Sequence, residues 1–207
     1  MQNVEEIQKK SGYHHGNLKQ ALIDASIKVL EEEGIEALSL RRSAREANVS
    51  QAAPYSHFRD KRDLLAATAE VGFQRLALKM VEDAIGTKTV LERLEKLSLS
   101  YINFAMENQA LFYLMFGREI GNISDYPTLA MTAGKGYALI SGAISNYYTE
   151  NKITDKDPKA VTASIWGMVH GLASLLVDQK LKIENIEADT QEEFVQKIFG
   201  ALKGGVI

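Results

Sequence analysis

Apolar residues recur at spacings of three and four along almost the whole 207-residue chain, with little period-two alternation. That spacing gathers apolar side chains on one face of an α-helix, whereas a half-buried strand needs strict alternation. Only three prolines interrupt the pattern, at positions 54, 127 and 158. We therefore expect an all-α fold.

Start and stop signals divide this pattern into about nine helices. Ser39 and Asp60 are typical N-cap residues, because their side-chain oxygens accept hydrogen bonds from free backbone N–H groups. Gly34 is expected to end the first helix, since glycine adopts the left-handed conformation without strain. The expected helices span about 17–34, 39–47, 51–58, 60–85, 89–108, 109–116, 127–151, 158–181 and 190–203.

Composition excludes several classes of protein. The chain has no cysteine, so it has no disulfide, thiolate metal site or cysteine nucleophile. It lacks a run of 18 apolar residues, and its first residues do not resemble a secretion signal. We expect a cytoplasmic protein that does not bind a membrane and needs no cofactor. His14 and His15 are adjacent and lack a third ligand at useful spacing, so no metal site is expected.

Two short helices joined by the turn Asn48-Val49-Ser50 predict a helix-turn-helix. Asn48 tolerates the left-handed backbone that so tight a turn requires. Ser50 is expected to cap the second helix, and Pro54 lies close enough to that cap to remove about one hydrogen bond at most. The second helix of such a motif enters the major groove of DNA, although any helical hairpin in a bundle gives the same spacing.

Side chains on this motif suit contacts with DNA. Gln51 can pair with adenine and Ala52 can touch a thymine methyl, while Ser56 and His57 let the backbone approach base edges. Phosphate contacts are expected from Arg41, Arg42, Lys61 and the Tyr55 hydroxyl, and from the helix N-termini at Ser39 and Ser50. Residues 39–62 hold six basic and two acidic side chains, a net charge of +4 in a chain of net charge −3.

The segment 21–65 resembles the DNA-binding domain of tetracycline-repressor (TetR) family regulators. The matching motifs are ALIDA at 21–25, EEEG at 31–34, ALSLRR at 37–42, Ala44, ANVS at 47–50, YSHF at 55–58 and KRDLL at 61–65. Two departures concern Asn48, where the family has glycine, and Pro54, where an aliphatic residue is common. WGMVHG at 166–171, together with YHHGNL at 13–18, resembles the subgroup with a Trp-His-Gly type of C-terminal domain.

The resemblance implies a homodimeric repressor that a small-molecule effector releases from a palindromic operator in double-stranded DNA. It also implies a division into a flexible N-terminal arm (1–16), a helix-turn-helix domain (17–65, with the motif at about 39–58) and a C-terminal ligand-binding and dimerisation domain (66–207). An all-helical enzyme using His170 and a carboxylate, and a protein-binding helical adaptor, are the alternatives.

Two features of the C-terminal part bear on this function. Ala163, Gly167, Gly171 and Ser174 form a line of small residues that predicts close approach of another helix, either within the chain or from a second copy through helices 158–181 and 190–203. A ligand pocket can be lined by Tyr101, Phe104, Phe112, Met115, Met131, Trp166 and His170. The alternative is an ordinary core in which His170 bonds to a backbone carbonyl.

Overall fold

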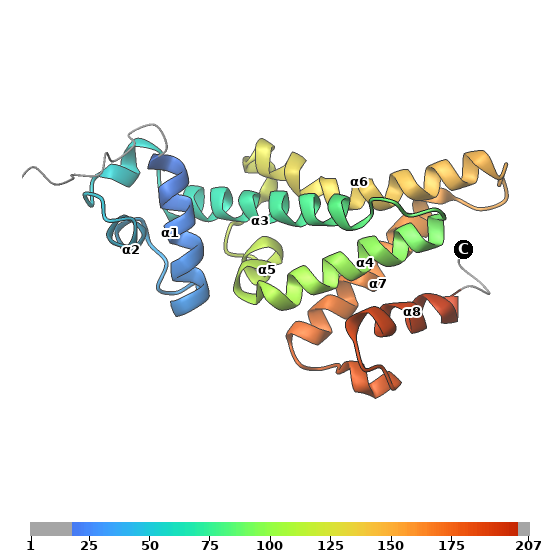
Figure 1. Ribbon diagram of the computed structural model, residues 1–207. Coiled ribbons are helices and arrows are strands. Elements are labelled where there is room, and N and C mark those ends of the chain that lie inside the picture. The colour runs from blue at the N-terminus through green and yellow to red at the C-terminus, as the bar shows by residue number, and fades with distance from the viewer. Residues whose placement is uncertain (1–17, 203–207) are drawn as a thin grey trace, which may run out of the picture.

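A computed structural model describes residues 18–202 of the chain. Over these residues it contains eight α-helices, three short 3-10 helices and no strand, which confirms the all-α fold (Figure 1). The α-helices are α1 (Leu18–Glu33), α2 (Leu40–Glu46), α3 (Lys61–Asp83), α4 (Val90–Glu107), α5 (Gln109–Phe116), α6 (Pro127–Glu150), α7 (Pro158–Val177) and α8 (Gln191–Leu202). The 3-10 helices are η2 (Ala53–Ser56), η3 (Ile123–Asp125) and η4 (Ile183–Ile186). The expected arm and His14 and His15 lie outside the described residues.

The N-cap hydrogen bonds expected at Ser39 and Asp60 are present in the structure. Ser39 Oγ accepts a hydrogen bond from the Arg42 N–H at 3.1 Å, and an Asp60 carboxylate oxygen accepts one from the Asp63 N–H at 3.0 Å. Gly34 has a φ of +82°, the left-handed conformation expected after α1. Helix α7 ends four residues before the expected position, and Gln179 just beyond it has a φ of +56°.

Two hydrophobic cores hold the molecule together, and they share helices. The smaller core joins α1, α2 and the start of α3 through Leu22, Ile23, Ile27, Leu40, Ala44, Phe58 and Leu64. The larger core fills the C-terminal part, yet it also contains Val29 and Leu30 of α1 and Leu65 of α3. One face of each shared helix therefore belongs to each core, and the N-terminal module is packed onto the C-terminal part.

Helix α3 runs from the α1–α2 module at one end of the molecule into the C-terminal part (Figure 1). It packs closely on α5 at Gly72, where an added Cβ would lie 2.6 Å from Met115 Sδ and 3.1 Å from Leu111 Cγ. Glycine at position 72 is therefore explained by a close approach between two helices.

Helix α7 is the one helix within residues 18–202 whose length and apolar composition would suffice to cross a membrane. A single helix of this kind is weak support for a membrane span, because core helices have the same composition. Only 33 % of its most apolar window is buried within the chain. Its apolar surface is therefore only partly covered by the rest of the molecule.

Candidate nucleic-acid interface

The predicted turn between the two helices of the motif forms at residues 47–50. Asn48 has a φ of +54°, so it adopts the left-handed conformation expected of it. The turn is held by the backbone N–H of Val49, which donates to the Ala44 carbonyl at 2.9 Å. Helix α2 before the turn buries Leu40 and Ala44 and leaves Arg41 and Arg45 exposed.

We call residues 51–58 the reading element. The expectation that this segment forms an α-helix is wrong. Its regular part is the short 3-10 helix η2, which contains Pro54. Proline has no N–H to donate and disfavours the α conformation of the residue before it. The Ser50 carbonyl accepts instead from the Ala53 N–H at 3.0 Å. Ser50 is not the cap that we expected, because the N-cap position of η2 is Ala52.

The reading element nevertheless presents the expected face to solvent. Pro54 and Phe58 are buried beneath it. The exposed residues are Ser50, Gln51, Ala52, Tyr55, Ser56 and His57, with Tyr55 at 55 % exposure. Short or polar side chains are therefore exposed at one end of the molecule, and the buried Pro54 and Phe58 anchor the backbone that carries them.

Basic residues occur on α2 before this face and at the start of α3 after it, and two of them were not among the predicted contacts. Arg45 and Arg62 are exposed like Arg41, and none of the three forms an ion pair within residues 18–202. Arg45 follows Arg41 by four residues, so a helical wheel places both on one face. Lys61 is half-buried, and its Nζ donates to the Ile35 carbonyl at 3.1 Å.

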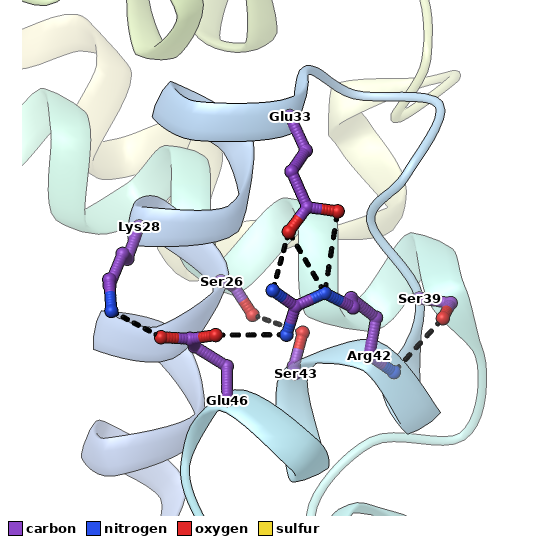
Figure 2. Close-up of polar contacts among 7 residues, drawn as sticks. All are labelled: Ser26, Lys28, Glu33, Ser39, Arg42, Ser43 and Glu46. Carbon is purple, nitrogen blue, oxygen red and sulfur yellow. Dashed lines mark hydrogen bonds and ion pairs between the residues drawn. The ribbon is translucent and has the colours of Figure 1, made fainter.

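Arg42 is the predicted phosphate contact that the structure places differently. Its guanidinium lies between two carboxylates, with Nε 3.1 Å from Glu33 Oε1 and Nη1 2.9 Å from Glu46 Oε2 (Figure 2). The other oxygen of Glu46 accepts from Lys28 Nζ at 2.5 Å. Only 19 % of the Arg42 side chain is exposed.

These contacts stabilise the ionised carboxylates. The hydrogen bond from Arg42 lowers the pKa of Glu33, and the hydrogen bonds from Lys28 and then Arg42 lower the pKa of Glu46. Beside the ion pairs, the hydroxyls of Ser26 and Ser43 are fully buried and lie 2.9 Å apart, joining α1 to α2 by a hydrogen bond (Figure 2). The two helices are therefore connected by polar contacts as well as by the small core.

Several of the residues expected to line a ligand pocket form one aromatic cluster. Tyr101 packs edge-on against Trp166 and Phe112, with ring centroids 5.3 and 6.0 Å apart. Phe116 was not among the predicted residues, and its ring centroid lies 4.6 Å from that of His170. Phe104 and Met115 are buried in the same large core.

Met131 does not join this group, because it is 68 % exposed. The buried face of α6 is formed by Leu129, Thr132, Gly136 and Ile140, and position 131 lies outside that face.

His170 and Tyr101 form a polar pair inside the cluster, with Nδ1 and the phenol oxygen 2.8 Å apart. Burial raises the pKa of Tyr101 and lowers the pKa of His170, so both groups are held neutral. The two neutral groups share one hydrogen bond, and the tautomer of His170 decides which of them donates. His170 therefore bonds to a tyrosine and not to a backbone carbonyl.

Neighbouring rings of the cluster pack against one another, with centroids 4.6–6.5 Å apart. One hollow of about 750 Å³ lies outside the cluster, between the α3–α4 connection and the end of α6. An apolar groove of about 510 Å³ runs between α3 and α6 and is lined by Leu78, Val81 and Leu139 among others.

Two family profiles match the chain in succession. "Bacterial regulatory proteins, tetR family" matches residues 22–68, and "Tetracyclin repressor-like, C-terminal domain" matches residues 94–202, just over half of the chain. The chain belongs to the TetR family. The first profile covers the reading element and its supporting helices, and this TetR-family chain is accordingly a DNA-binding transcription regulator. The narrower Trp-His-Gly subgroup stays a prediction.

A curated relative of this TetR-family chain is the HTH-type nicotine-responsive transcriptional repressor HdnoR of Paenarthrobacter nicotinovorans. The two are 38 % identical over 72 residues. The match spans 35 % of this chain and 37 % of the relative, so the chain matches about a third of that repressor.

Solved structures share the fold over almost the whole chain. A protein of unknown function from Rhodococcus sp. RHA1 is 28 % identical, with a TM-score of 0.80 over 95 % of this chain and 99 % of that one. The regulator FadR from Bacillus subtilis in complex with stearoyl-CoA is 16 % identical, with a TM-score of 0.71 over 91 % of this chain and 100 % of that one. At that identity the second likeness concerns the fold alone.

Proposed function

We propose that the protein is a homodimeric repressor that binds a palindromic operator and is released from it by a small-molecule effector. The observation that carries this proposal is the exposed face of the reading element, which stands on a buried support at one end of the molecule. Two such faces, roughly 34–36 Å apart, would enter successive major grooves of one duplex.

Within this proposal the contacts divide by chemistry. Gln51 and Ala52 touch base edges, and the exposed Ser56 and His57 lie beside them. Phosphate contacts come from two groups of residues. The first group is Ser39, Arg41, Ser50, Tyr55 and Lys61, which are the predicted contacts without Arg42, and the second is Arg45 and Arg62, which we add because both are exposed.

Selection of bound duplexes from a random pool tests DNA reading directly. We expect a two-fold symmetric site whose binding weakens as salt is added. Gln51→Ala should change the preferred sequence, whereas Tyr55→Phe should weaken binding to all duplexes alike. Recovery of the same sequence by Gln51→Ala would rule out base contact by Gln51, and recovery of no sequence by the wild type would refute the function.

Dimerisation through α7 and α8 is supported by an unexplained line of small residues. A Cβ added at Gly167 or Gly171 would meet no atom within 4 Å, so packing within the chain does not require glycine at either position. Glycine costs about 1 kcal/mol relative to alanine in a helix. Ala163 on the same line is exposed, and most of the apolar window of α7 is not buried. A second copy packed on this face accounts for these observations together.

Light scattering on the eluting protein tests the dimer. Gly167→Leu should convert a dimer into a monomer, because the larger side chain holds the two helices apart. Gly134→Leu on α6 is the matched control, since a Cβ there also meets nothing within 4 Å. A stable wild-type monomer at micromolar concentration, or equal behaviour of the two variants, would refute dimerisation through α7.

The effector site is proposed at the aromatic cluster of Tyr101, Phe112, Trp166 and His170, with Phe104 and Met115 beside it. The polar pair of His170 and Tyr101 inside an apolar surround supports this assignment, because ligand sites combine apolar walls with few polar groups. A ligand bound between these rings would have to separate side chains that now contact one another. The relative named as nicotine-responsive and the FadR complex support a small organic effector.

Thermal-shift screening of small organic molecules tests the effector site. Stabilising ligands of the wild type should lose their effect in Trp166→Ala and His170→Ala. The exposed Met131→Ala is the control and should respond as the wild type does. Ligands that stabilise all three variants equally would place the effector site elsewhere.

We also propose that the protein is cytoplasmic, has no enzymatic activity and follows the expected domain division at about residue 65. The family supports the first two proposals. The small core around Leu22, Leu40 and Leu64, which ends at the start of α3, supports the third.

A further inference from the structure

We propose that Arg42 is a positioning residue, which fixes the orientation of α2 on α1 and thereby aims the reading element, and that it does not contact DNA. This proposal depends on one part of the proposed function, namely that the protein binds some DNA sequences more tightly than others.

The ion pairs around Arg42 attach α2 to α1 at two separate points (Figure 2). At one point Arg42, in the first turn of α2, bonds to Glu33, the last residue of α1. At the other, Glu46 at the end of α2 bonds to Lys28 in the middle of α1. Arg42 also bonds to Glu46, so it links the two points. A helix held at two points can neither slide nor rotate freely on its neighbour.

Helix α2 needs such attachment because it is short and buries little. It has seven residues, and those it buries are Leu40, Ser43 and Ala44. The hydrogen bond between Ser26 and Ser43 adds one further contact near its centre. Without the ion pairs, α2 would be held by a small contact surface and would tilt more easily.

The consequence for DNA binding follows from the place of Glu46 in the chain. Glu46 is the last residue of α2, and the four-residue turn 47–50 separates it from the reading element. A tilt of α2 therefore passes directly to Gln51 and the residues after it. Base readout depends on hydrogen-bond geometry, so such a tilt reduces discrimination between sequences more than general attraction to DNA.

Charge argues against a phosphate contact by Arg42. Lys28, Glu46, Arg42 and Glu33 alternate in sign and sum to zero, so the group has no net charge with which to displace counterions from DNA. Arg41 is next in sequence, exposed and without an ion pair within residues 18–202. It is the suitable comparison for Arg42.

The test compares the doubly substituted Arg42→Met, Glu33→Gln protein with Arg41→Met. The double substitution removes the first attachment without changing the net charge. Each protein is titrated, at several salt concentrations, with a duplex that the wild type selects and with a scrambled duplex of equal length. For the double variant we expect at least a tenfold loss of affinity for the selected duplex, less than a twofold change for the scrambled one, and an unchanged salt slope. For Arg41→Met we expect both affinities to fall and the slope to fall by about 1.

Arg42→Lys provides a second variant that keeps the charge and the fold. A lysine cannot hold two carboxylates with a planar fork, so discrimination should again be lost. Wild-type discrimination by both Arg42 variants, or a salt slope lowered by about 1 in the double variant, would overturn the inference. A wild type that prefers no duplex would instead refute the proposed function. Circular dichroism confirms that each variant is folded.

Discussion

Two neutral side chains, His170 and Tyr101, face each other in the C-terminal part. Tyr101 is 1 % exposed, and its phenol oxygen lies 2.8 Å from His170 Nδ1. Protonation of His170 would make both of its ring nitrogens donors, so the phenol could then act only as the acceptor. The pair therefore ties the packing of the aromatic cluster to the protonation state of one imidazole.

This pair predicts a dependence of stability on pH. Burial lowers the pKa of His170 in the folded protein, so the unfolded chain takes up its proton at a higher pH. The stabilisation is complete above the ordinary histidine pKa of about 6.5 and is lost as pH falls below it. We expect the Tm to fall between about pH 7.5 and pH 5.5, and to fall less in His170→Asn. His57→Asn, at an exposed position, should follow the wild type, and identical curves for all three proteins would contradict this account.

The turn between α2 and the reading element depends on one residue with an uncommon backbone conformation. Asn48 has a φ of +54°, a region that most side chains avoid because Cβ approaches a carbonyl oxygen. Its position sets the direction in which the chain leaves α2. The geometry of the whole motif therefore depends on what residue 48 tolerates.

Substitutions at this position should separate by their backbone freedom. Asn48→Ala should lower the free energy of unfolding by about 1 kcal/mol, because alanine adopts the left-handed conformation at greater cost. Asn48→Gly should change it less, since glycine adopts that conformation freely. Urea denaturation measures both changes. Equal losses in the two variants would show that the side chain of Asn48, not its backbone, holds the turn.

The elements of this molecule were largely predictable from its sequence, because their signals are local. The caps at Ser39 and Asp60, the turn at Asn48 and the helical spacing need only neighbouring residues. The effect of Pro54 is larger than its position near the start of the helix indicates, because the helix expected over 51–58 is reduced to the four residues of η2.

The site was less predictable, because its contacts join distant residues. Arg42 looks like a phosphate contact until Glu33 and Glu46 are seen beside it. Arg42 follows Glu33 by nine positions, and the loop after α1 lies between them. The residue type of Met131 suits the apolar cluster, whereas the register of α6 turns its side chain outward.

At the scale of the whole molecule, the two cores are not independent. Leu22 and Leu30 lie on the same helix but belong to different cores, and so do Leu64 and Leu65. Loss of the small core would expose the other face of α1 and α3. The N-terminal module and the C-terminal part are therefore expected to unfold together.

The single tryptophan allows this to be measured. Trp166 packs against the large core, so its fluorescence follows the C-terminal part. Leu22→Ala in the small core should cost about 2–5 kcal/mol and should move the Trp166 transition as well as the loss of helical circular dichroism. Leu97→Ala in the large core is the control, because it should shift the transitions measured by Trp166 fluorescence and by circular dichroism. A Trp166 transition unaffected by Leu22→Ala would mean that the two parts unfold separately.

Helix α3 begins beside the reading element and continues without a break for 23 residues. At 1.5 Å per residue it is about 34 Å long, so pivoting it by about 3° carries its far tip through about 2 Å. Because α3 is one continuous helix, a change in the packing of the aromatic cluster can shift the start of α3 beside the reading element without a hinge. A small change in side-chain packing can therefore change the distance between the two reading elements of a dimer, so that they no longer match the spacing of successive major grooves.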